Sequence, residues 1–242
     1  MRHAVQWVLS LIFNIQMYLA LAVVGIVYLP YAIISRDGAL AGCHAYCRWV
    51  LFSLRVLTGM RTEVRGTPPE HEVLVAAKHQ SFLDILMIFN AVPRGKFIMK
   101  RELIYAPVLG WFGLRIGCVP VNRGKRGVAI LKMMADVKSG VHRPGQLIIY
   151  SQGTRIAPGV KAPYKAGTAA LYTQLGQDCY PVATNVGVLW PKREVLRKRG
   201  LAVVEFLPPI PAGLSNAEFM ERLEREVESA SDALMAEAGF RS

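Results

Sequence analysis

Apolar and polar positions divide the chain into an apolar amino-terminal part and a longer part in which short apolar runs alternate with amphipathic segments. From Val5 to Ile34 nearly every residue is apolar, and the interruptions are uncharged: Gln6, Ser10, Asn14 and Gln16. The stretch is long enough to cross a hydrocarbon core of about 30 Å. Its length, and the lack of a small-residue cleavage site after it, disfavour a signal peptide. We predict a membrane helix that either spans the bilayer or, as we slightly favour, forms one arm of a hairpin in one leaflet.

A second amino-terminal segment, Leu40–Met60, combines large apolar side chains with Arg48 and Arg55. The pattern predicts an amphipathic helix at the membrane interface, with arginines reaching towards lipid phosphates. We therefore expect residues 1–60 to form a membrane-docking helical pair and residues 61–242 to form the main domain.

The main domain shows alternating strand-like and helix-like patterns. The predicted strands are Glu72–Ala77, Lys96–Lys100, Gly117–Asn122, Gln146–Tyr150, Tyr180–Asn185 and Leu201–Phe206. The predicted helices are Phe82–Asn90, Gly127–Ser139, Lys165–Leu175 and Ala217–Glu237, the last preceded by a Ser215–Glu218 capping box. The alternation predicts a single α/β domain with a central mixed sheet flanked by helices.

His79 and Asp84 lie where the apolar run Val73–Ala77, a predicted buried strand, gives way to a helix. Such junctions are a common place for sites in α/β proteins. Imidazole near its ordinary pKa can take a proton from a hydroxyl at neutral pH, and a carboxylate on the other ring nitrogen would fix its tautomer. The pair is therefore a candidate general base with its orienting group.

A structural interpretation competes with this catalytic one. Ser81 and Asp84 also fit a capping box, in which Asp84 would serve only the helix terminus. Five residues of regular helix correspond to a rotation of about 140°, so His79 and Asp84 share no helix face. They meet only if His79 precedes the helix and Asp84 lies in its first turn.

Three further blocks have the same construction, an apolar run followed by a short polar segment that carries glycine or proline: Val119–Gly124, Ile148–Arg155 and Cys179–Asn185. Ligands bind at the carboxyl ends of strands in open α/β sheets. The four blocks in this order resemble the glycerophospholipid acyltransferase family, in particular the bacterial 1-acylglycerol-3-phosphate acyltransferases. The resemblance covers roughly residues 60 to 210.

The resemblance implies an enzyme that transfers a fatty acyl group from acyl-CoA or acyl carrier protein to the free sn-2 hydroxyl of 1-acylglycerol 3-phosphate, which gives phosphatidic acid. His79 would deprotonate the hydroxyl and Asp84 would hold the imidazole. A direct transfer of this kind needs no protein nucleophile, metal or prosthetic group. It also implies a bilayer-bound enzyme, which we expect at a bacterial inner membrane with its active site on the cytoplasmic face.

The same resemblance implies cationic binding of the acceptor's phosphate. Arg123 and Arg155 are the matched positions, since a guanidinium binds phosphate bidentately, and Lys100 lies in a further matching block. Structural alternatives are a solvated loop charge for Arg123 and an internal ion pair for Arg155. The residues expected to shape the adjoining loop are Gln152, Gly153 and Thr154.

Two positions depart from the family pattern. Lys78 replaces the usual asparagine before the histidine, and Gln152 replaces a glutamate, which removes a negative charge but keeps a hydrogen-bonding oxygen. If that glutamate contacts the acceptor, this chain would use another one, such as glycerol 3-phosphate or a lyso-ornithine lipid. Thioester hydrolysis and a non-catalytic lipid-binding role are the remaining alternatives.

Charge supports a membrane or phosphorylated partner. The net charge is +12 with 52% hydrophobic residues. Residues 216–242 hold seven acids and three bases, so the rest of the chain is strongly basic. No nucleic-acid-binding motif is present, and nucleic acid would not explain the apolar amino terminus. The basic cluster Lys192–Arg199 is interpreted as a solvated face, or as a contact for anionic lipid or an acyl carrier.

Four cysteines occur without zinc-site or C-x-x-C spacing: Cys43, Cys47, Cys118 and Cys179. Cys43 and Cys47, four apart on a predicted helix, share one face and are interpreted as small apolar packing residues. Free thiols suit a reducing cytosol. The P-loop, G-x-S-x-G and H-E-x-x-H patterns are also missing from the sequence. The sequence therefore argues against nucleotide hydrolysis, a serine esterase and a zinc protease.

Overall fold

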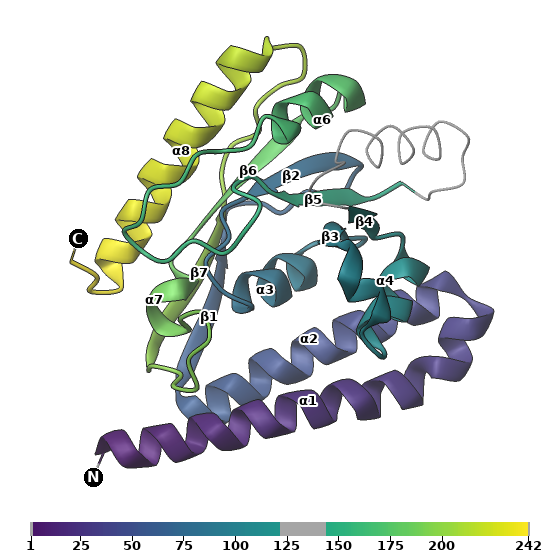
Figure 1. Cartoon of the computed structure of the whole chain (residues 1–242), viewed down its shortest axis with the longest axis vertical. Helices are drawn as coiled ribbons and strands as arrows, with labels where there is room; N and C mark the ends of the chain where they lie inside the picture. Colours follow the sequence, from purple (N-terminus) through teal and green to yellow (C-terminus); the bar gives the residue numbers. More distant parts are fainter. Residues whose placement is uncertain (1, 122–143, 242) are drawn as a thin grey trace.

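The computed structural model describes residues 2–121 and 144–241. The chain begins with two long helices, α1 (Arg2–Ile34) and α2 (Arg36–Thr58), which run side by side along one face of the molecule (Figure 1). Ser35 separates them, and its hydroxyl accepts a hydrogen bond from the Asp37 N–H and so caps α2. The sequence predicted a second helix from residue 40 to residue 60. Its start was placed four residues late, because α2 begins directly after Ser35, and its end two residues late, because Gly59 adopts a left-handed conformation that terminates α2.

A mixed sheet forms the centre of the domain, as predicted. In the described part of the chain its order is β1-β7-β6-β2-β5-β3-β4, and β6–β7 is the antiparallel pair. The strands are β1 (Met60–Arg65), β2 (Val73–Ala77), β3 (Lys96–Lys100), β4 (Val119–Val121), β5 (Gln146–Tyr150), β6 (Cys179–Thr184) and β7 (Gly200–Phe206). Strand β1 was not predicted, because half of its residues are charged and it lies at the edge of the sheet.

Helices cover both faces of this sheet (Figure 1). The bounds are α3 (Leu83–Ala91), the 3-10 turn η1 (Arg101–Tyr105), α4 (Leu109–Ile116), α6 (Gly167–Leu175), α7 (Val186–Leu189) and α8 (Asn216–Glu237). The capping box before α8 is confirmed, because Ser215 and Glu218 exchange hydrogen bonds. The sequence missed η1, α4 and α7, which are too short to show a helical period. The predicted helix Gly127–Ser139 lies outside the described residues.

Alternation along the central strand β2 separates two cores. Val73, Val75 and Ala77 join the apolar cluster shared with α2 and α3. Leu74 and Ala76 join the cluster shared with α6 and α8. Because side chains alternate across a strand, the two residues that follow β2 are directed to opposite faces of the sheet. The alternation along β2 therefore determines on which face of the sheet each of the next two side chains lies.

The polar residues of α1 hold this helix against the domain. Asn14 Oδ1 accepts a hydrogen bond of 2.7 Å from Arg197 Nη2, and the Arg197 N–H donates to Ser10 Oγ at 2.9 Å. Gln6 Nε2 donates to the carbonyls of Thr58 and Arg197. Residues 6, 10 and 14 are spaced four apart, so they share one helix face. The uncharged polar interruptions of the apolar run therefore mark the face of α1 that faces protein.

The cluster 192–199 is not a uniform solvated face, so that interpretation was wrong for Arg197. This side chain is 5% exposed and its guanidinium lies over the Trp190 ring, 4.1 Å from the centroid. Burial lowers the Arg197 pKa to about 10. Arg199 donates from Nε to Gln6 Oε1 at 3.1 Å. Two of the five cations therefore fasten α1 to the domain.

Candidate active site

The structure brings His79 and Asp84 together at the junction of β2 and α3. His79 Nδ1 and Asp84 Oδ1 lie 2.8 Å apart, and the Asp84 carboxylate is fully buried. The other oxygen, Oδ2, accepts hydrogen bonds of 2.8 Å from the backbone N–H groups of Gln80 and Ser81. One oxygen therefore binds the imidazole and the other binds the backbone that leads into α3. The Ser81–Asp84 capping box is wrong, because the N-cap of α3 is Phe82 and Ser81 Oγ accepts from the Leu83 N–H. The backbone contacts fix the carboxylate that orients the histidine.

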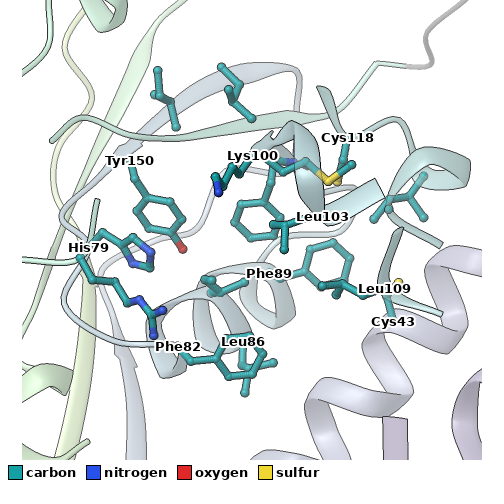
Figure 2. A pocket seen from close by; sticks show the side chains of 18 of the residues that line it. Cys43, His79, Phe82, Leu86, Phe89, Lys100, Leu103, Leu109, Cys118 and Tyr150 are labelled. Carbon is teal, nitrogen blue, oxygen red and sulfur yellow. Dashed lines mark hydrogen bonds between the residues drawn. The ribbon is translucent and has the colours of Figure 1, made fainter. Parts of the chain in front are cut away.

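The alternation of side chains along β2 places His79 on the face of the sheet that is covered by α2 and α3. Its side chain is 13% exposed and faces a cavity, whereas Lys78 faces α8. Tyr150, the last residue of β5, stacks on the imidazole with centroids 3.9 Å apart and an interplanar angle of 19°. Figure 2 shows the two rings side by side at one end of the cavity. His79 is therefore held by a hydrogen bond at Nδ1 and by a ring face, which leaves Nε2 as the nitrogen for substrate.

Tyr150 was not identified as a site residue from the sequence. Burial raises the pKa of its phenol well above the ordinary value, and the nearby Asp84 carboxylate adds to the effect. The hydroxyl is buried and interacts with the Asp84 carboxylate, which favours the protonated form. Tyr150 therefore remains a neutral phenol. The indication available in the sequence was its position, directly before the polar segment of the third block.

The cavity beside His79 has a volume of about 670 Å³. It extends between α3, α4 and the helical pair α1–α2 (Figure 2). Apolar side chains form most of its wall, among them Leu86, Phe89, Phe97, Leu109 and Phe112. A cavity of this size and character binds an apolar ligand group, with a few polar groups to orient it. Residues of α1 and α2 also line this cavity, so the helical pair forms part of its wall.

Cationic side chains gather on the same cavity. Lys100 and Arg155, both predicted, line it, whereas Arg123 lies outside the described residues. Lys100 also forms a 3.1 Å ion pair with Glu102 on the partly exposed η1 turn. The sequence interpretation missed three further lining cations: Lys165, Lys192 and Arg193. The last two were attributed to a solvated face, because a run of charges shows no sign of the cavity that the fold builds beside it.

The loop after β5 separates the three predicted loop-shaping residues. Gly153 adopts φ +73° and lines the cavity together with Thr154. The following Ile156 N–H donates to the His79 carbonyl at 2.8 Å, so this loop is tied directly to the base. Gln152 is buried away from the cavity, and its Nε2 donates to the Ala162 carbonyl at 3.3 Å. Gln152 therefore shapes the loop without lining the cavity.

The fold and the site together define an α/β enzyme with a histidine–carboxylate pair at one end of an apolar cavity. A model of the acyltransferase family matches residues 61–185 of the chain. This range contains His79, Asp84 and Arg155. The chain belongs to the acyltransferase family, and it is an O-acyltransferase.

Curated relatives and a solved structure agree with this assignment. The 1-acyl-sn-glycerol-3-phosphate acyltransferase of Pseudomonas aeruginosa is 27% identical over 194 residues, which cover 79% of this chain and 76% of the relative. The human 1-acyl-sn-glycerol-3-phosphate acyltransferase alpha is 30% identical, over 68% of this chain and 60% of the relative. The crystal structure of the LPA acyltransferase PlsC from Thermotoga maritima superposes with a TM-score of 0.81 at 22% identity, over 98% of each chain. The last comparison establishes the shared fold.

Proposed function

We propose that this enzyme transfers a fatty acyl group from an acyl thioester to the sn-2 hydroxyl of 1-acylglycerol 3-phosphate, giving phosphatidic acid for phospholipid biosynthesis. The observation that carries the proposal is the oriented base, His79 on Asp84, at one end of an apolar cavity that cations also line. The names of the curated relatives support the same acceptor. An amphiphilic substrate with an anionic headgroup fits both parts of this cavity.

The transfer follows from the position of the base. His79 Nε2 takes the proton of the acceptor hydroxyl while the oxygen attacks the thioester carbonyl. The C–O ester bond forms, the C–S bond breaks, and the proton passes from the imidazolium to the departing thiolate. Asp84 stabilises the imidazolium between these two steps. The protein's main contributions are deprotonation and the alignment of the two substrates, because a thiolate is already a good leaving group.

The acceptor's phosphate would be held by Arg155, with Lys100 and Arg123 as the other cations expected from the sequence. Arg155 lies on the loop that is hydrogen-bonded to the His79 backbone, so a phosphate bound there is placed at a fixed distance from the base. The replacement at Gln152 offered a reason to consider other acceptors. Its side chain lies outside the cavity wall, so it gives no direct contact by which the acceptor would change.

We further propose that α1 and α2 dock the enzyme on one leaflet of a bacterial inner membrane, with the active site on the cytoplasmic face. Within the described residues, His3–Ile34 is long and apolar enough to cross a membrane. Its polar face, however, is hydrogen-bonded to the Arg197 and Val195 carbonyls of the domain through Gln6 and Asn14. The opposite face exposes large apolar side chains such as Ile26 and Val27, and α2 adds Phe52. A helix fixed to its own domain along one side lies on a bilayer more readily than it spans one.

The test is acyl transfer by membranes that contain the protein, with 1-acylglycerol 3-phosphate and labelled acyl-CoA or acyl carrier protein. A His79→Ala variant at equal abundance is the matched control. Phosphatidic acid made by the wild type and not by the variant would support both the reaction and the base. Free fatty acid in place of phosphatidic acid would contradict the transfer and indicate hydrolysis. Equal transfer by the two proteins would refute the role of His79.

A further inference from the structure

The residue before the base is tied to the carboxy-terminal helix. Lys78 is 2% exposed, and its ammonium forms an ion pair with Glu228 of α8. Its backbone N–H donates to the Val182 carbonyl of β6 at 3.0 Å. Because alternation directs Lys78 and His79 to opposite faces, the ion pair holds the base's segment from behind the sheet. The family model ends at residue 185, so α8 lies beyond the part of the chain that it matches.

Glu228 also binds the second segment of the site. Its Oε1 accepts a hydrogen bond of 3.0 Å from the Tyr164 hydroxyl, while Oε2 faces Lys78. Tyr164 lies near the end of the loop that carries Gly153 and Arg155. The neighbouring Lys165 N–H closes that loop by donating to the Ser151 carbonyl at 2.8 Å. One carboxylate therefore links the segment of the base to the loop of the arginine.

The start of the loop is fixed by the Ile156 N–H, which donates to the His79 carbonyl, and its end is bound by Glu228 through Tyr164. Two of its buried polar atoms, Ser151 Oγ and Gln152 Oε1, have no partner among the described residues. Lys78 and Gln152 are also the two positions at which the sequence departs from the family pattern. The buried Lys78 ammonium requires an anionic partner, and residue 152, as glutamine, cannot supply one. Here α8 provides that anion.

We propose that Glu228 is a positioning residue for acyl transfer, which sets the arginine loop relative to His79 by binding Lys78 and Tyr164 together. The proposal rests on the proposed function. Displacement of bound groups by about 1 Å can cost on the order of 100-fold in rate. We therefore expect Glu228→Gln to lower kcat/KM for the lysophospholipid acceptor by about 10- to 100-fold, with a rise in acceptor KM and little change in donor KM.

If Glu228 served only to neutralise Lys78, variants of the ion pair would affect stability and transfer differently than if Glu228 positions the loop. In Lys78→Met/Glu228→Met both members of the ion pair become apolar side chains of similar length, which removes the uncompensated ammonium. We expect this double variant to recover the thermal midpoint lost in Glu228→Met but not the acceptor kcat/KM, since Tyr164 still lacks its partner. Tyr164→Phe, which deletes one hydroxyl, should raise acceptor KM in the same direction.

The experiment measures transfer by the full chain in mixed micelles, with 1-acylglycerol 3-phosphate and with acyl-CoA and acyl carrier protein in parallel. Glu221→Gln is the matched control, because that carboxylate lies on the same helix with its side chain 79% exposed. Activity of Glu228→Gln within twofold of the wild type, or full recovery of transfer in the double variant, would overturn the positioning role alone. Absence of transfer by the wild type would overturn the proposed function and this role with it.

Discussion

The phenol ring of Tyr150 lies against the imidazole of His79, with centroids 3.9 Å apart, while Asp84 holds the same imidazole through Nδ1 at 2.8 Å. The ring face limits tilting of the imidazole, and the hydrogen bond limits its rotation about χ2. The base is thus fixed in both directions before substrate arrives. Such preorganisation is what a reaction governed by alignment requires.

Tyr150→Phe keeps the stacked ring and removes a buried hydroxyl that lies near the Asp84 carboxylate. We expect its kcat to stay within about threefold of the wild type, whereas Tyr150→Leu should lower kcat by about tenfold because the imidazole regains freedom to tilt. Steady-state kinetics on both variants checks this. A large loss in Tyr150→Phe would show instead that the hydroxyl takes part in the reaction.

Asp84→Asn should separate the two duties of this carboxylate. The amide oxygen still accepts backbone N–H groups, so the free energy of unfolding should change by only about 1 kcal/mol. The charge that stabilises the imidazolium is lost, so kcat should fall by about 10²- to 10⁴-fold. Chemical denaturation and kinetics on the same preparation measure both quantities. Asp84→Ala also leaves the backbone N–H groups of Gln80 and Ser81 without their acceptor, so it should be clearly less stable than Asp84→Asn.

Arg155 is expected to act on the acceptor and not on the donor. Arg155→Lys retains the charge but loses bidentate binding, and Arg155→Gln loses both, so acceptor KM should rise in that order. We expect a rise of about 10- to 100-fold for Arg155→Gln with donor KM unchanged. Initial rates with each substrate varied in turn provide the measurement. Equal increases in the two KM values would place Arg155 outside the phosphate site.

The exposed apolar face of α1 should govern binding to lipid. A charged residue at the centre of a bilayer costs about 2.5 to 3.5 kcal/mol, so Ile26→Glu combined with Val27→Glu should lower partition into anionic vesicles by at least about 100-fold. Both side chains are largely exposed, so the thermal midpoint should not change. Vesicle co-sedimentation tests this, with Val64→Glu on the edge strand β1 as an exposed apolar control. Equal partition of all three proteins would contradict docking through α1.

Gly113 offers a way to test where the acyl chain lies. It lines the cavity, and a Cβ there would approach Met99 Sδ at an ordinary 3.5 Å. Gly113→Ala should therefore keep the wild-type preference, whereas Gly113→Phe should fill part of the cavity and shift use towards shorter acyl donors. Competition between thioesters of different chain length shows the shift. An unchanged preference in Gly113→Phe would place the acyl chain elsewhere.

Much of the fold follows from local patterns in the sequence. The strand before His79 is buried on both faces and so forms a continuous apolar run, and α8 shows both its capping box and its apolar side. Local patterns did not predict strand β1, because an edge strand needs little apolar surface. They also did not predict η1, α4 and α7, because a helix of one or two turns is too short to show a helical period. The apolar run of α1 and its pairing with a second helix were evident, but the hydrogen bonds of Gln6 and Asn14 to Val195 and Arg197 were not.

The sequence by itself determined the chemistry of the base: His79 and Asp84 in one short segment, on a chain with an apolar amino terminus and an excess of basic residues. Tertiary structure alone decided that Tyr150 covers the imidazole, that Lys192 and Arg193 line the cavity, and that Glu228 binds Lys78 from 150 residues away. The physical reason is the range of the interactions. A hydrogen bond within one short segment follows from the spacing of its residues in the sequence. Contacts between distant segments form only after the strand order and the alternation of side chains along each strand have placed those residues on the same face of the sheet.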